Sequence, residues 1–102
     1  MLAPPDGFLI GHWTDPVGRT GCTAILVPEG AVAGGEVRGG GPGTREMDLL
    51  TPASGPRLIQ GALFTGGSAF GLAAADGVVQ WLAEHGHGHP TRFGVRIPLV
   101  PA

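Results

Sequence analysis

The sequence predicts an α+β fold organised around one strand–turn–helix unit, residues 58–84. The unit begins with a short apolar run, residues 58–64, whose length and bulky side chains indicate a buried strand. Residues 65–68 (Thr-Gly-Gly-Ser) interrupt that run, and a helical pattern follows from Ala69. The polar side chains of this helix recur every four residues and therefore share one narrow stripe: Asp76, Gln80 and Glu84.

The helix that begins at Ala69 requires cover on more than one side. A surface helix buries roughly 100° of its circumference, whereas here everything outside the polar stripe is apolar or small. Two sheets, a sheet with further helices, or a partner subunit would each supply that cover. Ser68 is predicted to be the N-cap, and Gly66 and Gly67 let the backbone turn sharply out of the strand. Strand, glycine turn and helix N-terminus together form a candidate site for an anion or oxyanion.

Length and composition limit the fold to a single partial domain, residues 1–102. A chain of 102 residues forms at most one domain with a modest core of its own. Its 42% hydrophobic and 14% charged residues exclude a disordered chain, while 20 Gly and 10 Pro predict many loops. We therefore expect the chain to be part of something larger.

Charge and cysteine content exclude several classes of partner. The net charge is −2, and the six basic residues are arginines without a basic cluster, so neither nucleic acid nor an anionic membrane is an expected partner. The single Cys22 forms no internal disulfide, and residues 1–8 lack the basic and long apolar regions of a signal peptide. A reducing, cytoplasmic location is expected.

Turn residues divide the rest of the chain into short elements. Clusters of Pro, Gly and Asp mark the boundaries, and apolar runs or alternation mark the strands. In chain order we expect an N-terminal arm (1–7), a hairpin of two strands (8–13 and 21–27), a third strand (31–38), a glycine-rich loop (39–46), one helical turn (47–52), a link (53–57) and, after the helix, a loop (85–90) and an extended tail (92–101).

Two well-known motifs nearly match residues 66–71, and both fail. The nucleophile-elbow pattern G-x-S-x-G requires glycine where Phe70 stands, so capping, and not nucleophilic attack, is the expected role of Ser68. The same residues do not fit G-x-G-x-x-G, and the chain has no lysine to complete a P-loop. Nucleotide binding is therefore disfavoured.

The histidines and the cysteine do not predict a functional site. His85, His87 and His89 would share one face if their loop were extended, but intervening glycines and the lack of nearby ligands disfavour a metal site. We expect a solvated loop, no metal and no cofactor. His12 is expected to be a partly buried strand residue, and Cys22 a small core residue.

Three charged residues flank the glycine-rich loop: Arg38, Arg45 and Glu46. In one interpretation they only pair with one another. In the other they support the loop near a ligand, since binding residues concentrate on loops that a scaffold positions.

Five groups of residues, in one order along the chain, carry a resemblance to a known family: 11–15 (GHWTD), 21–23 (GCT), 28–34 (PEGAVAG), 37–40 with 42–46 (VRGG and PGTRE), and 63–72 with 75–78 (LFTGGSAFGL and ADGV). They are similar to the DmpA-type aminopeptidases. That family comprises L-aminopeptidase/D-amidase/D-esterases, β-peptidyl aminopeptidases and, more distantly, nylon-oligomer hydrolases. The resemblance covers almost the whole chain, although residues 85–89 have no clear counterpart.

The resemblance implies an N-terminal-nucleophile hydrolase with an αββα sandwich. Such a protein is made as a precursor that cuts itself into a larger α chain and a smaller β chain. The new N-terminal Ser or Thr of the β chain attacks an amide or ester of a peptide or related oligomer, and its own α-amine serves as the base. The implied partners are the rest of the α chain, the β chain and further copies in a homotetramer.

One departure from the family limits what the resemblance transfers. The family's oxyanion-stabilising Tyr and Asn lie further along the α chain, and this sequence contains neither residue type. No catalytic residue is therefore assigned here, and the segment alone is expected to be inactive. We expect it to be the N-terminal part of an α chain.

The resemblance also suggests a border of the substrate cleft, formed by Thr65, Gly66, Gly67 and Ser68. Backbone N–H groups at a helix N-terminus can stabilise developing negative charge. Alternatively, the two glycines serve only to pack the helix on the sheet. Two other functions stay open: a non-catalytic fragment of this fold, and a small module that binds an anion without turnover.

Overall fold

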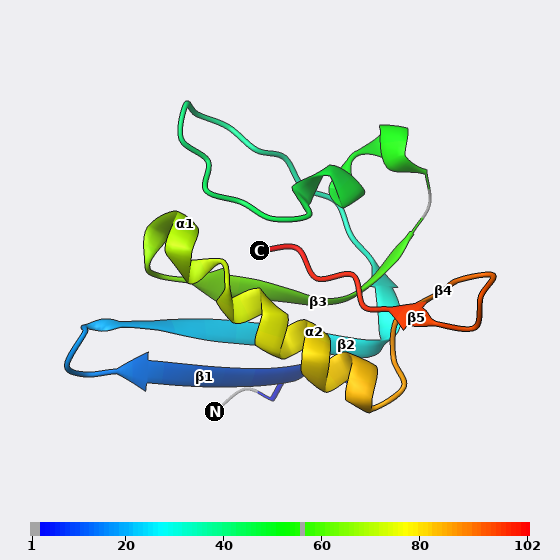
Figure 1. Ribbon diagram of the computed structural model, residues 1–102, viewed down its shortest axis with the longest axis horizontal. Helices are drawn as coiled ribbons and strands as arrows, with labels where there is room; N and C mark the ends of the chain where they lie inside the picture. The colour runs from blue at the N-terminus through cyan, green and yellow to red at the C-terminus, as the bar shows by residue number, and fades with distance from the viewer. Residues whose placement is uncertain (1–2, 56) are drawn as a thin grey trace.

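A computed structural model describes residues 3–55 and 57–102 and shows a mixed α and β structure (Figure 1). Three strands form an antiparallel sheet in the order β1 (Leu9–Asp15), β2 (Thr20–Val32) and β3 (Leu58–Thr65). Helix α2 (Ala74–Glu84) crosses one face of this sheet, and the short helix α1 (Ser68–Gly71) lies beyond one end of β3. The α+β class predicted from the sequence is confirmed.

Strands β1 and β2 form the predicted hairpin. Their register runs from Leu9 opposite Leu26 to Asp15 opposite Thr20. The Asp15 carboxylate accepts hydrogen bonds from the backbone N–H groups of Val17 and Gly18, each 3.0 Å long. A side chain that bonds the backbone two or three residues on stabilises a turn, so Asp15 helps to fix the register of the hairpin.

The predicted third strand, residues 31–38, is wrong. Residues 31–32 are the end of β2 and pair with Leu58 and Ile59 of β3 after an interruption of the ladder between Leu26 and Ala31. Pro28 has no N–H to donate and Gly30 has φ +96°, which accounts for the interruption. Residues 33–38 form no strand, because their glycines offer no side chain to pack on a sheet.

The single predicted helix is instead two helices. The hydrogen bonds that join α1 to α2 span three residues rather than four, as in Leu72 N–H to Ala69 O (3.3 Å) and Ala75 N–H to Leu72 O (3.0 Å). The predicted cap is also wrong. Gly67, with φ +85°, is the N-cap residue of α1 without a side-chain bond, and Ser68 lies inside α1 with φ +58°.

Helix α2 packs on the sheet through one face only. Ala75 and Leu82 are fully buried, and a Cβ built on Gly61 of β3 would lie 3.7 Å from Val78 Cγ1. The polar stripe is exposed as predicted, but small residues of α2 and Trp81 are exposed beside it. Within residues 3–55 and 57–102, the chain therefore covers one of the sides that this helix presents.

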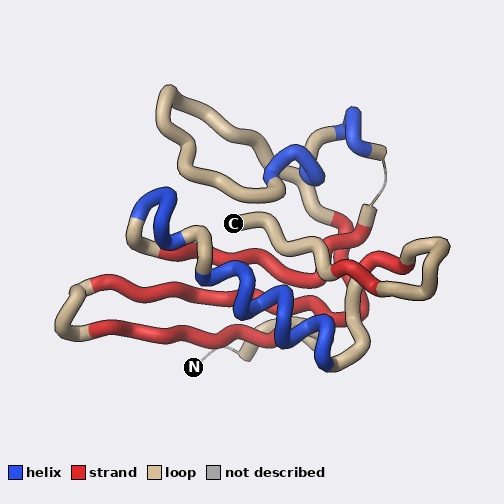
Figure 2. The backbone as a smooth tube through the Cα atoms, viewed as in Figure 1, coloured by secondary structure: helices blue, strands red, loops and turns tan. Residues whose placement is uncertain are grey.

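The C-terminal tail extends along β3 and the glycine-rich loop extends above it (Figure 2). Gln60 N–H donates to Leu99 O (3.0 Å) and Leu63 N–H to Pro101 O (2.9 Å), so the tail follows β3 in a parallel direction. The other short elements are the 3₁₀ turns η1 (Met47–Leu50) and η2 (Pro52–Ser54) and the strands β4 (His89–Pro90) and β5 (Arg96–Ile97). The helical turn predicted at 47–52 is confirmed, whereas the loop and tail predicted at 85–90 and 92–101 contain a short hairpin.

The sheet face opposite α2 carries exposed apolar side chains. Side chains alternate along a strand, and Gly61 and Leu63 face α2, so Ala62 and Phe64 face the other way together with Ile25 and Ile10. Phe64 and Ile10 are 65% and 50% exposed. No helix within the described ranges is long and apolar enough to span a membrane.

Candidate functional site

A depression of about 350 Å³ lies where four parts of the chain meet. These are the glycine-rich loop (residues 41–43), the end of β3 (residues 63–65), the α1 region with Ser68 and Leu72, and Ala102 of the tail. The structure therefore brings Thr65 and Ser68, predicted as part of a cleft border, together with a loop more than twenty residues away in sequence.

Two glycines adjacent in sequence to residues that line this depression, Gly66 and Gly71, lie in close contact with other parts of the chain. Gly66 N–H donates to Gly21 O (2.9 Å), and a Cβ on Gly66 would overlap Thr20 Oγ1. A Cβ on Gly71 would overlap the carbonyl oxygen of Gly66. At Gly71 the neighbouring atom belongs to the backbone, which only a glycine can approach this closely, whereas at Gly66 it belongs to the Thr20 side chain. These contacts join the turn at Gly66 to the start of β2, and both predicted roles of Gly66 and Gly67, at the cleft and in helix-to-sheet packing, stay predictions.

Gly67 and Ser68 occupy two consecutive left-handed positions, with φ values of +85° and +58°. Thr65 Oγ1 lies 3.0 Å from the carbonyl oxygen of Gly66 and 3.2 Å from that of Gly71, so its one proton is shared between these two acceptors and closes the turn. A non-glycine residue at positive φ is held at a conformational cost that surrounding contacts must offset. The first backbone N–H groups of a helix have no hydrogen-bond acceptor within the helix. Ser68, the first residue of α1, lines the depression.

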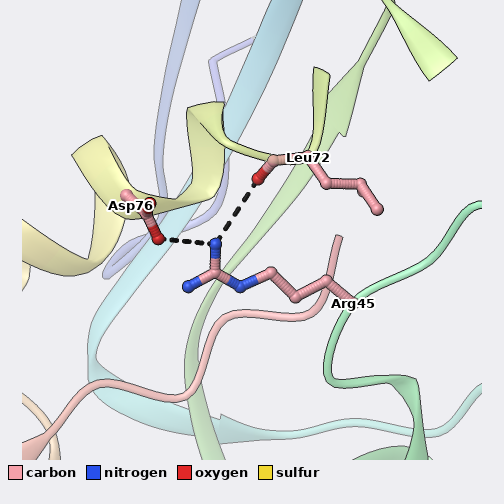
Figure 3. Close-up of polar contacts among 3 residues, drawn as sticks. All are labelled: Arg45, Leu72 and Asp76. Carbon is pink, nitrogen blue, oxygen red and sulfur yellow. Dashed lines mark hydrogen bonds and ion pairs between the residues drawn. The ribbon is translucent and has the colours of Figure 1, made fainter. Parts of the chain in front are cut away.

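Arg45 links the glycine-rich loop to the helices and to the tail (Figure 3). Its Nη1 lies 2.6 Å from Asp76 Oδ1 and 3.5 Å from Leu72 O, at the junction of α1 and α2. Its backbone exchanges two hydrogen bonds with Ala102, of 2.7 and 2.9 Å. One residue therefore ties together three of the four parts that surround the depression.

The other two loop-flanking residues are not part of this arrangement. Arg38 Nη2 pairs with Glu36 Oε1 at 2.8 Å, and both side chains are exposed. Glu46 adopts the left-handed conformation, with φ +60°, and precedes η1 without a side-chain capping bond. The interpretation that Arg38, Arg45 and Glu46 pair with one another is therefore wrong, and Arg45 alone contacts the helices.

The histidines are spread over separate surroundings. His85 stacks on Trp81 with ring centroids 4.0 Å apart, and its Nδ1 lies 2.7 Å from Trp81 O. His87 Nδ1 lies 4.0 Å from Glu29 Oε1, and His89 belongs to β4. Within the described part of the chain, no group of three or more His, Cys, Asp or Glu residues could hold a metal ion.

His12 is exposed, contrary to the expectation of a partly buried residue. Its Nδ1 lies 2.8 Å from Thr23 Oγ1 on the neighbouring strand. The two residues face each other on the sheet side away from α2, which explains the exposure. Cys22 is half-buried on the other side, opposite Trp13.

Comparison with known proteins decides the family. The chain matches the sequence profile of Peptidase family S58 over residues 6–102. The protein belongs to this family. The resemblance to the DmpA-type aminopeptidases is thereby confirmed.

Mycobacterial relatives of this S58 chain are considerably longer. It is 48% identical over 97 residues, or 95% of its length, to uncharacterized aminopeptidases of Mycobacterium tuberculosis, Mycobacterium bovis and Mycobacterium leprae. The match covers 26% of the M. tuberculosis and M. bovis proteins and 25% of the M. leprae protein. The chain thus spans about a quarter of the length of these relatives.

Two residues around the depression have no functional role in the prediction from the sequence, Asp76 and Ala102. Asp76 was assigned only to a solvated stripe, although it is the partner of Arg45 from 31 residues away. Ala102 lies just beyond the predicted tail (92–101), and it lines the depression. One feature of the sequence indicates a distant partner for Asp76. It is the acidic residue in the first turn of α2, and the residue four positions on is Gln80, so no basic residue there can pair with it within the helix.

Proposed function

We propose that this chain is one part of a self-processing aminopeptidase or amidase of the N-terminal-nucleophile type. The observation that carries the proposal is the match to Peptidase family S58 over residues 6–102, together with relatives that are named aminopeptidases. In this proposal the chain supplies scaffold and part of the cleft wall. The substrates are amides or esters of peptides or related oligomers.

The reacting groups of the proposed enzyme lie outside these 102 residues. A Ser or Thr exposed by self-cleavage attacks the carbonyl carbon, and its free α-amine accepts the hydroxyl proton. The same amine then protonates the leaving amine, and water releases the acyl group. The present chain contributes no Tyr or Asn to stabilise the oxyanion, because it contains neither residue.

The proposed fold of the complete protein is an αββα sandwich. The apolar side chains that support this proposal lie on the sheet face away from α2, where Ile10 and Phe64 are exposed. A second sheet packed there would remove them from water, and a further layer or subunit would cover Trp81 on α2. Assembly into a homo-oligomer and a cytoplasmic location are part of the same proposal.

Within this enzyme, we assign residues 65–68 to the wall of the substrate cleft and Arg45 to the support of the glycine-rich loop. Gly67→Val in the intact protein tests the first assignment, because a β-branched residue at φ +85° must move the turn. We expect lower self-cleavage and turnover. Gly94→Val is the matched control, since it places the same side chain at a similar φ of +83° in the connection between β4 and β5, and Gly94 does not line the depression. Unchanged rates in Gly67→Val would remove the cleft role.

Intact-mass analysis and N-terminal sequencing of the purified full-length protein test the main proposal. We expect two polypeptides, the second of which begins with Ser or Thr, and hydrolysis of amino-acid p-nitroanilides or amides. Replacement of that Ser or Thr by Ala should leave one uncut polypeptide without turnover. A single wild-type polypeptide that lacks hydrolytic activity would instead support a non-catalytic protein of this fold.

A further inference from the structure

A second cavity, of about 550 Å³, lies at the opposite end of β3. It is bounded by the interrupted part of β2 at Pro28, by the start of β3 at Leu58, and by the turn and hairpin around β4 and β5. Five ionisable side chains line it: Glu29, Arg57, His87, His89 and Arg96. A volume between about 300 and 1,000 Å³ is typical of sites for small molecules.

The charge in this cavity is opposite to that of the whole chain. Two arginines and one glutamate line it, so the cavity carries a net positive charge of one with neutral histidines, whereas the chain has a net charge of −2. The Glu29 side chain is 93% exposed and lies 4.0 Å from His87 Nδ1 at the solvent side. The carboxylate is therefore at the edge of the cavity. Arg57 and Arg96 are exposed as well, so water screens all three charges.

The two arginines retain unused donors. Arg57 Nε donates to Ser54 O (3.3 Å), and Arg96 Nη1 donates to Gly88 O (3.2 Å). In the ranges 3–55 and 57–102, neither arginine forms an ion pair with a carboxylate. A guanidinium has five N–H donors, so each arginine has several that are not used by these bonds.

The walls of the cavity are built from paired backbone. Pro90 of β4 pairs with Arg96 of β5, and His89 pairs with Ile97. Gly88 is buried at φ +146°, and a Cβ there would overlap the backbone between Ile97 and Pro98. The segment predicted to be a solvated loop therefore holds two of its three histidines, His87 and His89, at the same cavity as the arginines.

We propose that this cavity binds a small oxyanion, a carboxylate or a phosphate group. The planar fork of a guanidinium matches two oxygens of such a group, and imidazole nitrogens add further donors. Two arginines disfavour a cation in the same place by charge repulsion. The ligand does not overlap the proposed cleft, because Leu58 and Thr65 at the two ends of β3 are about 23 Å apart at the rise of a strand.

Titration of the intact protein with inorganic phosphate and, separately, with acetate tests this proposal. Calorimetry or NMR in a low-salt buffer free of other oxyanions measures the affinity, and the tighter ligand identifies the class. We expect saturable binding that Arg57→Gln and Arg96→Gln each weaken about tenfold, the effect of losing one charge-assisted hydrogen-bonding group. Glu29→Gln should strengthen binding, because it removes the repelling charge.

Arg92→Gln is the matched control. Arg92 lies in the same hairpin connection, stacks on Phe93 at 4.8 Å, and does not line the cavity. If Arg92→Gln lost as much affinity as Arg57→Gln and Arg96→Gln, the attraction would be non-specific and the proposal would be wrong. It would also be wrong if neither anion bound in a saturable way. A third titration uses zinc alone. If the protein binds zinc but neither anion, and Glu29→Gln weakens the binding of zinc, the cavity is a cation site and the proposal is wrong. Arg57→Gln keeps the test valid if Arg96→Gln loosens the hairpin through its bond to Gly88.

Discussion

At the scale of the residue, two glycines of neighbouring helices, one in α1 and one in α2, differ in how closely other atoms approach them. Gly71 lies against the carbonyl oxygen of Gly66, whereas a Cβ on Gly77 would meet open space. Gly71→Ala forces the β3–α1 turn to move, and we expect it to lower the free energy of unfolding by about 1–3 kcal/mol. Gly77→Ala should raise it by about 0.5–1 kcal/mol, because alanine loses less backbone entropy in a helix.

Urea denaturation of the intact protein compares the two glycine variants directly. Both variants replace a hydrogen by a methyl group, Gly71 four residues and Gly77 ten residues after Gly67. The difference between their free energies of unfolding therefore isolates the effect of the close approach at Gly71. If Gly71→Ala were as stable as Gly77→Ala, the contact between α1 and the carbonyl of Gly66 would not hold in solution.

Arg45 and Arg38 provide a second matched pair at the residue scale. The Arg45 side chain is 33% exposed and bonds Asp76 and Leu72 O, whereas the Arg38 pair with Glu36 is fully at the surface. We expect Arg45→Gln to lower the free energy of unfolding by about 1 kcal/mol and Arg38→Gln to change it by less than about 0.5 kcal/mol. Thermal or urea denaturation measures both.

A double-mutant cycle of Arg45→Gln with Asp76→Asn separates the ion pair from the other contacts of Arg45. A coupling of about 0.5–1 kcal/mol is expected for a pair whose acidic partner is largely exposed. Zero coupling, with a full effect of Arg45→Gln alone, would assign the effect to the bond with Leu72 O.

Sequence reasoning identifies residues better than it identifies their partners. Arg45 could be singled out because it flanks a glycine-rich loop, but its partner Asp76 is brought to it only by the crossing of α2 over the sheet. Ser68 shows the converse. Its type is common at N-caps, yet Gly67 takes that position and Ser68 is the first residue of α1, also with a positive φ.

At the scale of the element, Gln60 connects the C-terminal tail to β3. Its backbone N–H donates to Leu99 O, and its buried side-chain oxygen accepts from Leu99 N–H at 2.8 Å. Gln60→Met removes that acceptor and leaves a buried N–H without a partner, so we expect a loss of about 1–3 kcal/mol. Hydrogen exchange of the Leu99 amide should become faster.

Gln80→Met is the control for this element. The Gln80 side chain is exposed and donates only to Glu84 Oε1, one helical turn away, at 2.8 Å. Its replacement should change the free energy of unfolding by less than about 0.5 kcal/mol. Unaltered exchange at Leu99 in Gln60→Met would show that the backbone bonds alone hold the tail.

The elements that sequence predicted best are those with local signals. The first hairpin has turn residues between two apolar runs, and β3 has a continuous apolar run, so both were predictable. The extension of β2 to Val32 and the parallel tail at 98–102 were not, because each depends on partners distant in sequence. Two prolines in the tail also interrupt any strand pattern.

At the scale of the whole molecule, exposed apolar surfaces on α2 and on the sheet indicate that further layers pack against this chain. The apolar helix predicts the need for cover, and among residues 3–55 and 57–102 the chain covers one side of α2. The depression beside Thr65 and Ser68 was predictable as a turn before a helix. Its opposite wall was not, since the loop and Ala102 reach it through tertiary contacts.

Ile10 and Ile97 test whether another layer covers the open face of the sheet. Each is 50% exposed in this chain, but Ile10 lies on the sheet face away from α2 and Ile97 lies in the β4–β5 hairpin. If only these 102 residues mattered, replacement of either by Ser would cost about the same. In the full-length protein we expect Ile10→Ser to lower the free energy of unfolding by at least about 2 kcal/mol more than Ile97→Ser, as for a buried isoleucine. Urea denaturation measures the difference, and equal losses would show that no sheet packs against Ile10 and would contradict the proposed sandwich.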